Sequence, residues 1–180
     1  MVDFVSAPAA ARPVTRFFSF PNPVNEISVR VVAGGVTLLT STAIVSGQPW
    51  LVALIAYGFV ARALSGPRLS PLAQLANRVV VPRLGRAPRP VPGPPKRFAQ
   101  GVGAVLTVVA AVLALGFDAA PAVDALLALV VASALLESVF GYCVGCKIFA
   151  LLMRAGVIPP EVCESCNDIW APARRPPGHA

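Results

Sequence analysis

Charge is the first thing this sequence has little of. Only 13% of its 180 residues are Asp, Glu, Lys or Arg, whereas a water-soluble domain devotes roughly a quarter of its residues to charge. The hydrophobic fraction is 56%, and the mean hydropathy is +0.73. This composition is unlike that of an ordinary soluble domain and indicates that much of the surface faces lipid.

Histidine and the usual motifs of soluble enzymes are scarce as well. The one histidine, His179, lies outside every hydrophobic segment, so haem ligation by histidine within the membrane is excluded. No phosphate-binding loop, Ser/His/Asp arrangement or paired-carboxylate site is present. The first 26 residues lack the apolar run of a secretion signal. We therefore expect the chain to insert through its own helices.

The hydrophobic residues are gathered into four segments, at 27–46, 49–64, 98–117 and 119–142. About 20 apolar residues are needed for a helix to cross the hydrocarbon core. We therefore predict an all-α integral membrane protein with four transmembrane helices, the second being the shortest. Arg62, at the end of that second helix, is expected to snorkel toward the headgroups. Buried core helices of a soluble protein are the alternative interpretation.

The basic residues are segregated along the chain. All 15 Lys and Arg lie before residue 31, between 62 and 97, or after Cys146. The turns expected at 47–48 and 118–124 contain none. Because Lys and Arg accumulate on the cytoplasmic side, both termini and the central loop are predicted to be cytoplasmic.

The predicted organisation has five parts, and the central loop itself divides in two. The parts are an N-terminal tail (1–26), helices one and two (27–65), a basic loop (66–97), helices three and four (98–142) and a cysteine-bearing tail (143–180). The first half of the loop predicts a short interfacial helix over 70–82, with Ser70 as N-cap. The proline-dense second half, 85–97, predicts an extended linker that forms neither helix nor sheet ladder.

The positive charge of the central loop has two interpretations. Orientation in the membrane and attraction to anionic lipid headgroups explain it without a further partner. Docking to an acidic protein or to nucleic acid is the alternative. We favour the lipid interpretation and expect no nucleic-acid partner.

Two charges lie inside the predicted helices, Arg30 near the start of the first and Glu137 near the end of the fourth. These helices run antiparallel, so both residues fall at similar depth in the membrane. Burying a carboxylate at that depth costs free energy unless it is paired, protonated or near water. We predict an Arg30–Glu137 ion pair. The alternatives are separate contacts with headgroups and interfacial water, or proton transfer by Glu137 near the thiols.

All four cysteines lie in two CxxC pairs, Cys143/Cys146 and Cys163/Cys166, separated by 16 residues. In the predicted topology both pairs face the reducing cytosol, which disfavours a structural disulfide. The intervening residues 147–156 have a helical pattern that ends at a glycine. A helix that folds back along the interface would bring the two pairs together.

Three kinds of chemistry fit these thiols. If the fourth helix breaks at Gly141 or Gly145, the first pair begins a new helix beside Lys147, which favours thiolate and hence disulfide exchange. The spacing also falls in the range of four-thiolate zinc sites, with all four cysteines as ligands. Sulfur carriage as a persulfide is the third alternative, and four inert thiols are the least favoured.

Three stretches carry a family resemblance: FPNPVNE before the first helix, GYCVGCKIFALL after the fourth, and RAGVIPPEVCESCND in the tail. Over about residues 21–168 the chain resembles the small bacterial membrane proteins of the domain of unknown function 4395 family. Genes of this family often lie beside those of thioredoxin-like proteins and rhodanese-type sulfurtransferases. The resemblance therefore implies thiol or sulfur chemistry by the four cysteines, at the inner face of the bacterial cytoplasmic membrane.

The leading hypothesis is a membrane-anchored thiol or sulfur relay. In it, the Cys143/Cys146 pair exchanges with Cys163/Cys166 and with a thioredoxin-like or sulfurtransferase partner, and no cofactor is required. One alternative is a scaffold in which the four thiolates hold zinc. Another is a small transporter of a sulfur species, whose solute path would require a homo-oligomer.

Overall fold

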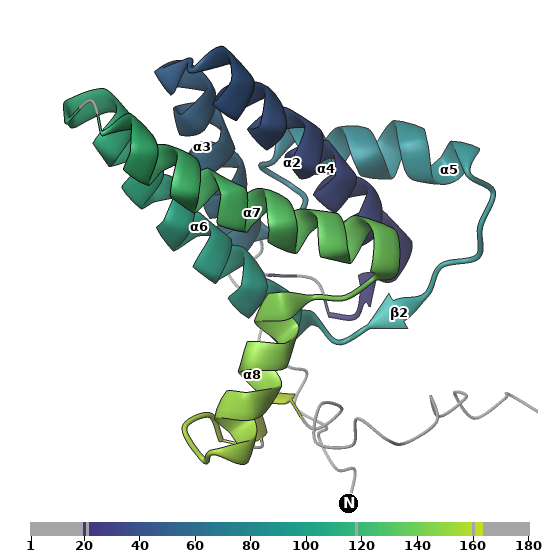
Figure 1. Cartoon of the computed structure of the whole chain (residues 1–180). Coiled ribbons are helices and arrows are strands. Elements are labelled where there is room, and N and C mark those ends of the chain that lie inside the picture. Colours follow the sequence, from purple (N-terminus) through teal and green to yellow (C-terminus); the bar gives the residue numbers. More distant parts are fainter. Residues whose placement is uncertain (1–19, 21, 118, 160, 164–180) are drawn as a thin grey trace, which may run out of the picture.

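Four long helices form an antiparallel bundle in the computed structural model, which describes residues 20, 22–117, 119–159 and 161–163. They are α2 (Glu26–Ser46), α3 (Pro49–Ser65), α6 (Gly93–Gly116) and α7 (Ala120–Phe140). The tight α2–α3 and α6–α7 turns lie at the same end of the bundle (Figure 1). The predicted all-α class is confirmed, since the described strands β1 (Val24–Asn25) and β2 (Pro90–Val91) have two residues each.

Three of the four bundle helices are long and apolar enough to cross a membrane. Helices α2, α6 and α7 have 21, 24 and 21 residues, which supports a lipid bilayer as the environment of the protein. Helix α3 has 17 residues. At 1.5 Å per residue it is about 25 Å long, somewhat less than the hydrocarbon thickness of about 30 Å. It is the segment that the sequence already predicts to be the shortest.

The bundle core is made of small and branched residues that let the helices approach closely. Helix α2 packs on α7, and α3 packs on α6. At Gly103 of α6, an added Cβ would lie 2.3 Å from the ring of Phe59 on α3. A side chain at this position would therefore separate the two helices. Leu127 of α7 is among the most deeply buried side chains, at 1% exposure.

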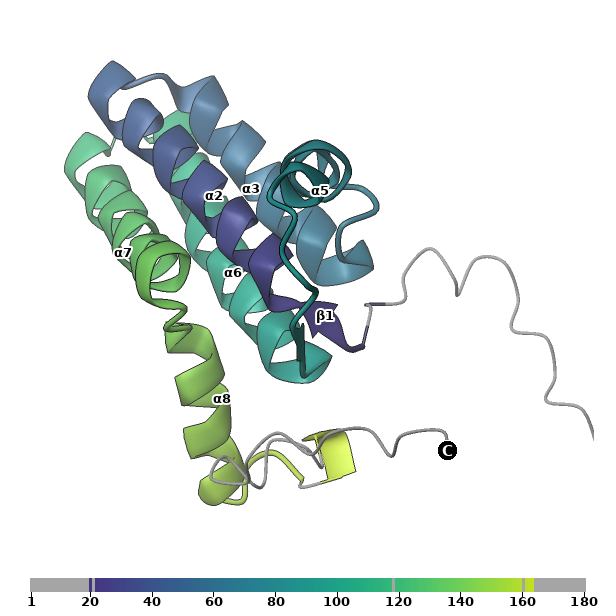
Figure 2. The ribbon, with the colours of Figure 1, turned by 90° about the vertical axis from the view of Figure 1, so that its right-hand side faces the viewer.

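The first half of the central loop forms the predicted short helix. Helices α4 (Pro71–Leu75), η1 (Ala76–Val80) and α5 (Val81–Arg83) follow one another without a break. They run across the bundle, so that the segment is seen end-on in Figure 2. Ser70 is the N-cap, its Oγ accepting a hydrogen bond from the Ala73 N–H. The helix passes Pro82 because the wide π-turn of η1 precedes it, where a regular helix would clash with the proline ring.

The second half of the loop is more ordered than the sequence predicts. Strand β2 pairs antiparallel with β1, Val91 opposite Val24 and Pro90 opposite Asn25, and α6 begins at Gly93 with prolines in its first turn. The expectation of neither helix nor ladder over 85–97 was therefore wrong. Proline is tolerated here because N–H groups in the first turn have no helical partner.

Asparagine side chains tie this loop to the segment that precedes α2. The Oδ1 of Asn25 accepts hydrogen bonds from the N–H groups of Ile27 and Arg89, both at 3.2 Å. The Oδ1 of Asn22 accepts from the Gly93 N–H at 3.0 Å. The start of α6 is thus held beside the start of α2.

Helix α8 (Val144–Arg154) leaves the bundle at the end opposite the tight turns (Figure 1). Helix α7 ends at Gly141, whose φ of 69° is left-handed, and α8 then departs from the bundle (Figures 1 and 2). The Phe149 ring of α8 is buried and lies 5.6 Å from the Phe98 ring of α6. As predicted, a left-handed glycine, Gly156, follows the helix.

Candidate functional site

The first cysteine pair lies at the start of α8. Cys143 is the N-cap residue of that helix, with extended backbone angles, and its Sγ accepts a hydrogen bond from the Cys146 N–H at 3.3 Å. Cys143 is buried and Cys146 is half-buried, and both are free thiols. Of the two helix breaks considered from the sequence, at Gly141 or at Gly145, the structure has the one at Gly141. It gives the first thiol the N-terminal position that favours a thiolate.

The glycine between the two cysteines sets how closely α8 approaches α6. A Cβ built on Gly145 would lie 2.6 Å from the Ala99 Cβ and 2.7 Å from the Ala99 Cα. Since one of these atoms is backbone, the two helices would have to separate to admit a side chain. Gly145 therefore places the cysteine pair against the first turns of α6, which carry Lys96.

Replacing Gly145 by alanine is expected to weaken the docking of α8. The overpacking should cost about 1–3 kcal/mol, against about 1 kcal/mol gained in helix propensity. We also expect slower alkylation of Cys143 at neutral pH, since the pair moves away from Lys96. Thermal unfolding and alkylation rates measure the two effects. Gly101→Ala is the matched control because an added Cβ there meets no atom within 4 Å; equal behaviour of the two variants would contradict the close approach.

An ion pair lies beside the thiols. The Lys96 Nζ of α6 is 2.5 Å from the Glu137 Oε1 of α7, and the two side chains are only 12% and 13% exposed. Both charges act on Cys143. Sequence reasoning missed Lys96, because it assigned residue 96 to the extended linker. The Pro-Pro-Lys-Arg run after a glycine is the signal of a helix start that could have placed it.

The predicted Arg30–Glu137 ion pair was wrong, although the ends of α2 and α7 do meet. Glu137 pairs with Lys96 instead. Arg30 pairs with Glu26 at 3.8 Å and donates hydrogen bonds to the carbonyl oxygens of Ser138 (3.2 Å) and Val139 (2.6 Å). The physical reason is that the last carbonyls of a helix lack partners and carry partial negative charge, which attracts a cation.

The two thiols of the pair are not equivalent. A hydrogen bond from the Cys146 side chain lowers the pKa of Cys143, and Lys96 and the Cys146 N–H add to this, outweighing burial and Glu137. The pKa of Cys146 is raised, first because its thiol makes that hydrogen bond, then through burial and the charge of Cys143. Of the two thiols, Cys143 is therefore the one that ionises first, and Cys146 is its protonated neighbour.

A groove of about 730 Å³ gives access to both thiols. Its apolar walls include Val91, Phe140, Tyr142 and Phe149, and its basic residues are Lys96, Lys147 and Arg154. The described residues that line it include no Asp or Glu. The groove thus combines apolar side chains, three basic residues and two cysteines in one lining.

The second pair does not join the first within the described residues. Cys163 is buried and disulfide-bonded, although a reducing cytosol disfavours a structural disulfide, and Cys166 lies outside the described residues. The turn at 161–163 lies beside the C-terminal half of α8, whereas Cys143 caps its N-terminus (Figures 1 and 2). Among the residues that the structure describes, no three His, Cys, Asp or Glu side chains form a potential metal site.

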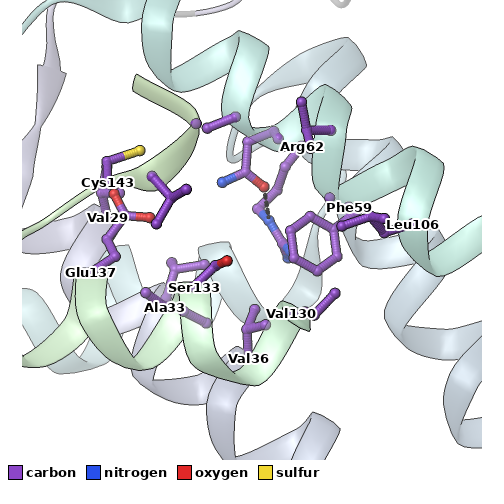
Figure 3. Close-up of a pocket in the computed structure, with 18 of the residues that line it drawn as sticks. Val29, Ala33, Val36, Phe59, Arg62, Leu106, Val130, Ser133, Glu137 and Cys143 are labelled. Carbon is purple, nitrogen blue, oxygen red and sulfur yellow. Dashed lines mark hydrogen bonds between the residues drawn. The ribbon is translucent and has the colours of Figure 1, made fainter. Parts of the chain in front are cut away.

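Behind the thiol pair, a small cavity of about 100 Å³ reaches into the bundle. Glu137 and Cys143 line one side of it, across from Arg62 and Phe59 (Figure 3). The prediction that Arg62 snorkels outward was wrong, because its side chain turns inward and is 5% exposed. It donates hydrogen bonds to Gln100 Oε1 (2.9 Å) and Ser70 Oγ (3.2 Å), and its guanidinium lies 4.6 Å from the Phe59 ring centroid. These inward partners replace the headgroups.

A family model described as domain of unknown function DUF4395 matches residues 24–154, and the chain belongs to this family. The matched range includes the four bundle helices, α8, and the first cysteine pair. Cys163 and Cys166 lie beyond it. No curated protein and no solved structure matches the chain.

Proposed function

We propose that this DUF4395 member is a membrane-anchored dithiol that exchanges disulfides with a partner through Cys143 and Cys146. The observation that carries the proposal is the hydrogen bond from the Cys146 N–H to the Cys143 Sγ at the N-terminus of α8. With Lys96 nearby, this arrangement stabilises the thiolate that attacks a disulfide. The half-buried Cys146 follows in the same helical turn and is positioned to resolve the product.

The exchange takes place in two steps. The Cys143 thiolate attacks one sulfur of a partner disulfide, forming a mixed disulfide and releasing the other partner sulfur as a thiolate, which takes up a proton. Cys146 then loses its proton and attacks the Cys143 Sγ, which forms the Cys143–Cys146 disulfide and releases the second partner thiol. Two electrons pass to the partner, and a dithiol of a reduced partner protein reduces the pair again by the reverse sequence, becoming a disulfide itself.

The groove supports a protein partner rather than a free thiol of low mass. Its walls provide an apolar surface beside the two sulfurs, and its basic residues favour a partner segment that carries negative charge. A thioredoxin-like or sulfurtransferase protein is the partner class that we propose. Cys163 and Cys166 are the second dithiol of the relay, which exchanges with the Cys143/Cys146 pair. The disulfide at Cys163 supports redox activity there.

We place this centre at the cytoplasmic face of a bacterial membrane. The start of α2, the start of α6, the end of α7 and α8 all lie at one end of the bundle (Figure 1), and this end carries Arg30, Lys96 and Lys147, basic residues of the kind that favour the cytoplasm. The short helix α3 is the fourth span in this proposal, with its packing against α6 holding it at the depth of its neighbours.

The relay is better supported than a four-thiolate zinc scaffold. A sulfur in a disulfide cannot bind zinc as a thiolate, and Cys163 is in a disulfide. The described thiols also do not gather into a group of three or more ligands. Tight binding of one zinc per chain, with protection of all four thiols from alkylation until a chelator is added, would reverse this preference.

The pH dependence of alkylation tests the assignment of the nucleophile. Since the thiolate is the reactive form and the pKa of Cys143 is lowered, its modification by iodoacetamide should reach half its maximal rate below the pH expected of an ordinary thiol. Cys146, whose pKa is raised, should react slowly across the same range. Peptide mass spectrometry of the full-length protein in native membranes separates the two sites. Faster modification of Cys146 than of Cys143 at neutral pH would contradict the proposal.

A further inference from the structure

The buried cation Arg62 has no countercharge among the described residues. The ion pairs found there join Arg30 to Glu26 and Lys96 to Glu137. Arg62 is 5% exposed, and its hydrogen bonds go to the neutral acceptors Gln100 and Ser70. Removing a cation from water costs several kcal/mol unless an anion compensates. Two neutral hydrogen bonds and one aromatic ring leave the positive charge unbalanced.

A cavity of about 220 Å³ adjoins this guanidinium, and its largely apolar walls include several hydrogen-bond donors. Arg62, Lys96, Gln100, Asn77 and Ser28 line it, and its described lining includes no Asp or Glu. The volume exceeds that of several water molecules, at about 30 Å³ each. It therefore has space for a small polyatomic ion together with water.

The two amide side chains present their nitrogen atoms as unused donors. The Gln100 oxygen accepts from Arg62 Nε, and the Asn77 oxygen accepts from the Ser28 hydroxyl. Within the described part of the chain, neither amide nitrogen donates a hydrogen bond to a protein group. The cavity therefore offers one uncompensated guanidinium and two amide donors, a set that suits an anion with several acceptor oxygens.

We propose that this cavity binds a small tetrahedral oxyanion, with Arg62 as its principal ligand. Inorganic sulfate and phosphate have the required chemistry, and so does the phosphate of a lipid headgroup entering from the membrane surface. The site is separate from thiol exchange, although both touch Lys96. Failure of either proposal leaves the other standing.

The test is a binding measurement on the full-length protein in a non-ionic detergent. Sulfate or phosphate is titrated by calorimetry, and thermal unfolding is followed in parallel, at constant ionic strength maintained with potassium gluconate. We expect saturable binding of one ion per chain and a rise in the unfolding temperature. Gln100→Glu is the decisive variant, because it places a carboxylate at the atom that already accepts from Arg62 Nε at 2.9 Å.

This isosteric change supplies the missing countercharge, so sulfate affinity should fall by about tenfold or more while the ion-free protein stays folded. Arg83→Gln removes one exposed positive charge elsewhere and should bind like the parent. A sulfate-induced thermal shift in the parent that is equally large in Gln100→Glu would overturn the proposal. Arg62→Gln should lose binding as well, but Gln100→Glu keeps the test valid should Arg62→Gln fail to fold.

A second titration with short-chain phosphatidylglycerol distinguishes the source of the oxyanion. Binding of the lipid alone, lost in Gln100→Glu, would assign the site to a headgroup phosphate and sustain the proposal. Binding of the inorganic ions, lost in the same variant, would assign it to a free oxyanion. If neither inorganic ion nor lipid binds saturably to the parent, the inference is wrong.

Discussion

Replacing Cys143 by serine is expected to abolish disulfide exchange while leaving the helical bundle intact. Cys143 provides the only thiol whose pKa is lowered among the described residues, and a serine hydroxyl at the same N-cap position is not a nucleophile toward disulfides. Serine is also a favoured N-cap residue, so α8 should keep its start. The readout is reduction of the aromatic disulfide dithiobis(nitrobenzoic acid), or of the disulfide of a thioredoxin-like partner, by the protein in detergent. Circular dichroism confirms that the fold is kept.

Cys146→Ser should behave differently, and the difference tests the order of the two steps. Cys143 still attacks, but no resolving thiol follows, so a mixed disulfide between this chain and its partner should accumulate on non-reducing gels. The hydrogen bond that the Cys146 thiol makes to Cys143 can be replaced by the serine hydroxyl, so the attack itself should persist. A mixed disulfide that forms through Cys146 in the Cys143→Ser variant, instead of through Cys143, would reverse the assigned roles.

The bundle could be predicted because hydrophobic length is a local property of the sequence. Each predicted span is within a few residues of a helix, except that α6 begins at Gly93 instead of residue 98. That error came from counting prolines without regard to position in the helix. Pro94 and Pro95 fall in the first turn, where they cost no hydrogen bond. The Val24–Val91 pairing joins distant segments of two residues each, too short for any periodic signal.

The helix break at the thiol site could be predicted from the sequence, but the partners of the charged residues around it could not. Gly141 marks the end of α7 by a rule that depends on one residue, and the position of Cys143 follows from it. The partners of Glu137 and Arg62 depend on which side chains from other helices arrive at the same depth. Arg30 matched Glu137 in depth, but Lys96 reaches it from α6. Arg62 turned inward because Gln100 and Phe59 face it. The sequence pattern of α3 does not predict either contact.

Lys96→Gln and Glu137→Gln are expected to shift the pKa of Cys143 in opposite directions. The hydrogen bond from Cys146 causes most of the lowering, but Glu137 raises this pKa and Lys96 lowers it. Loss of the cation should therefore raise the pKa of Cys143 and slow its alkylation at neutral pH. Loss of the carboxylate should lower the pKa further and speed the reaction. The measurement is the alkylation rate of Cys143 as a function of pH in each full-length variant.

Both single variants should also lose stability, because each leaves a buried charge without its partner. The Lys96 and Glu137 side chains are 12% and 13% exposed, and breaking such a pair costs about 3–5 kcal/mol of unfolding free energy. The double variant Lys96→Gln/Glu137→Gln should recover much of that loss, since two neutral amides can hydrogen-bond to each other. If the pair were only structural, the single variants would lose stability equally and leave the pH profile of Cys143 unchanged. Opposite shifts with similar losses of stability therefore separate an ion pair that tunes the thiolate from one that merely joins α6 to α7.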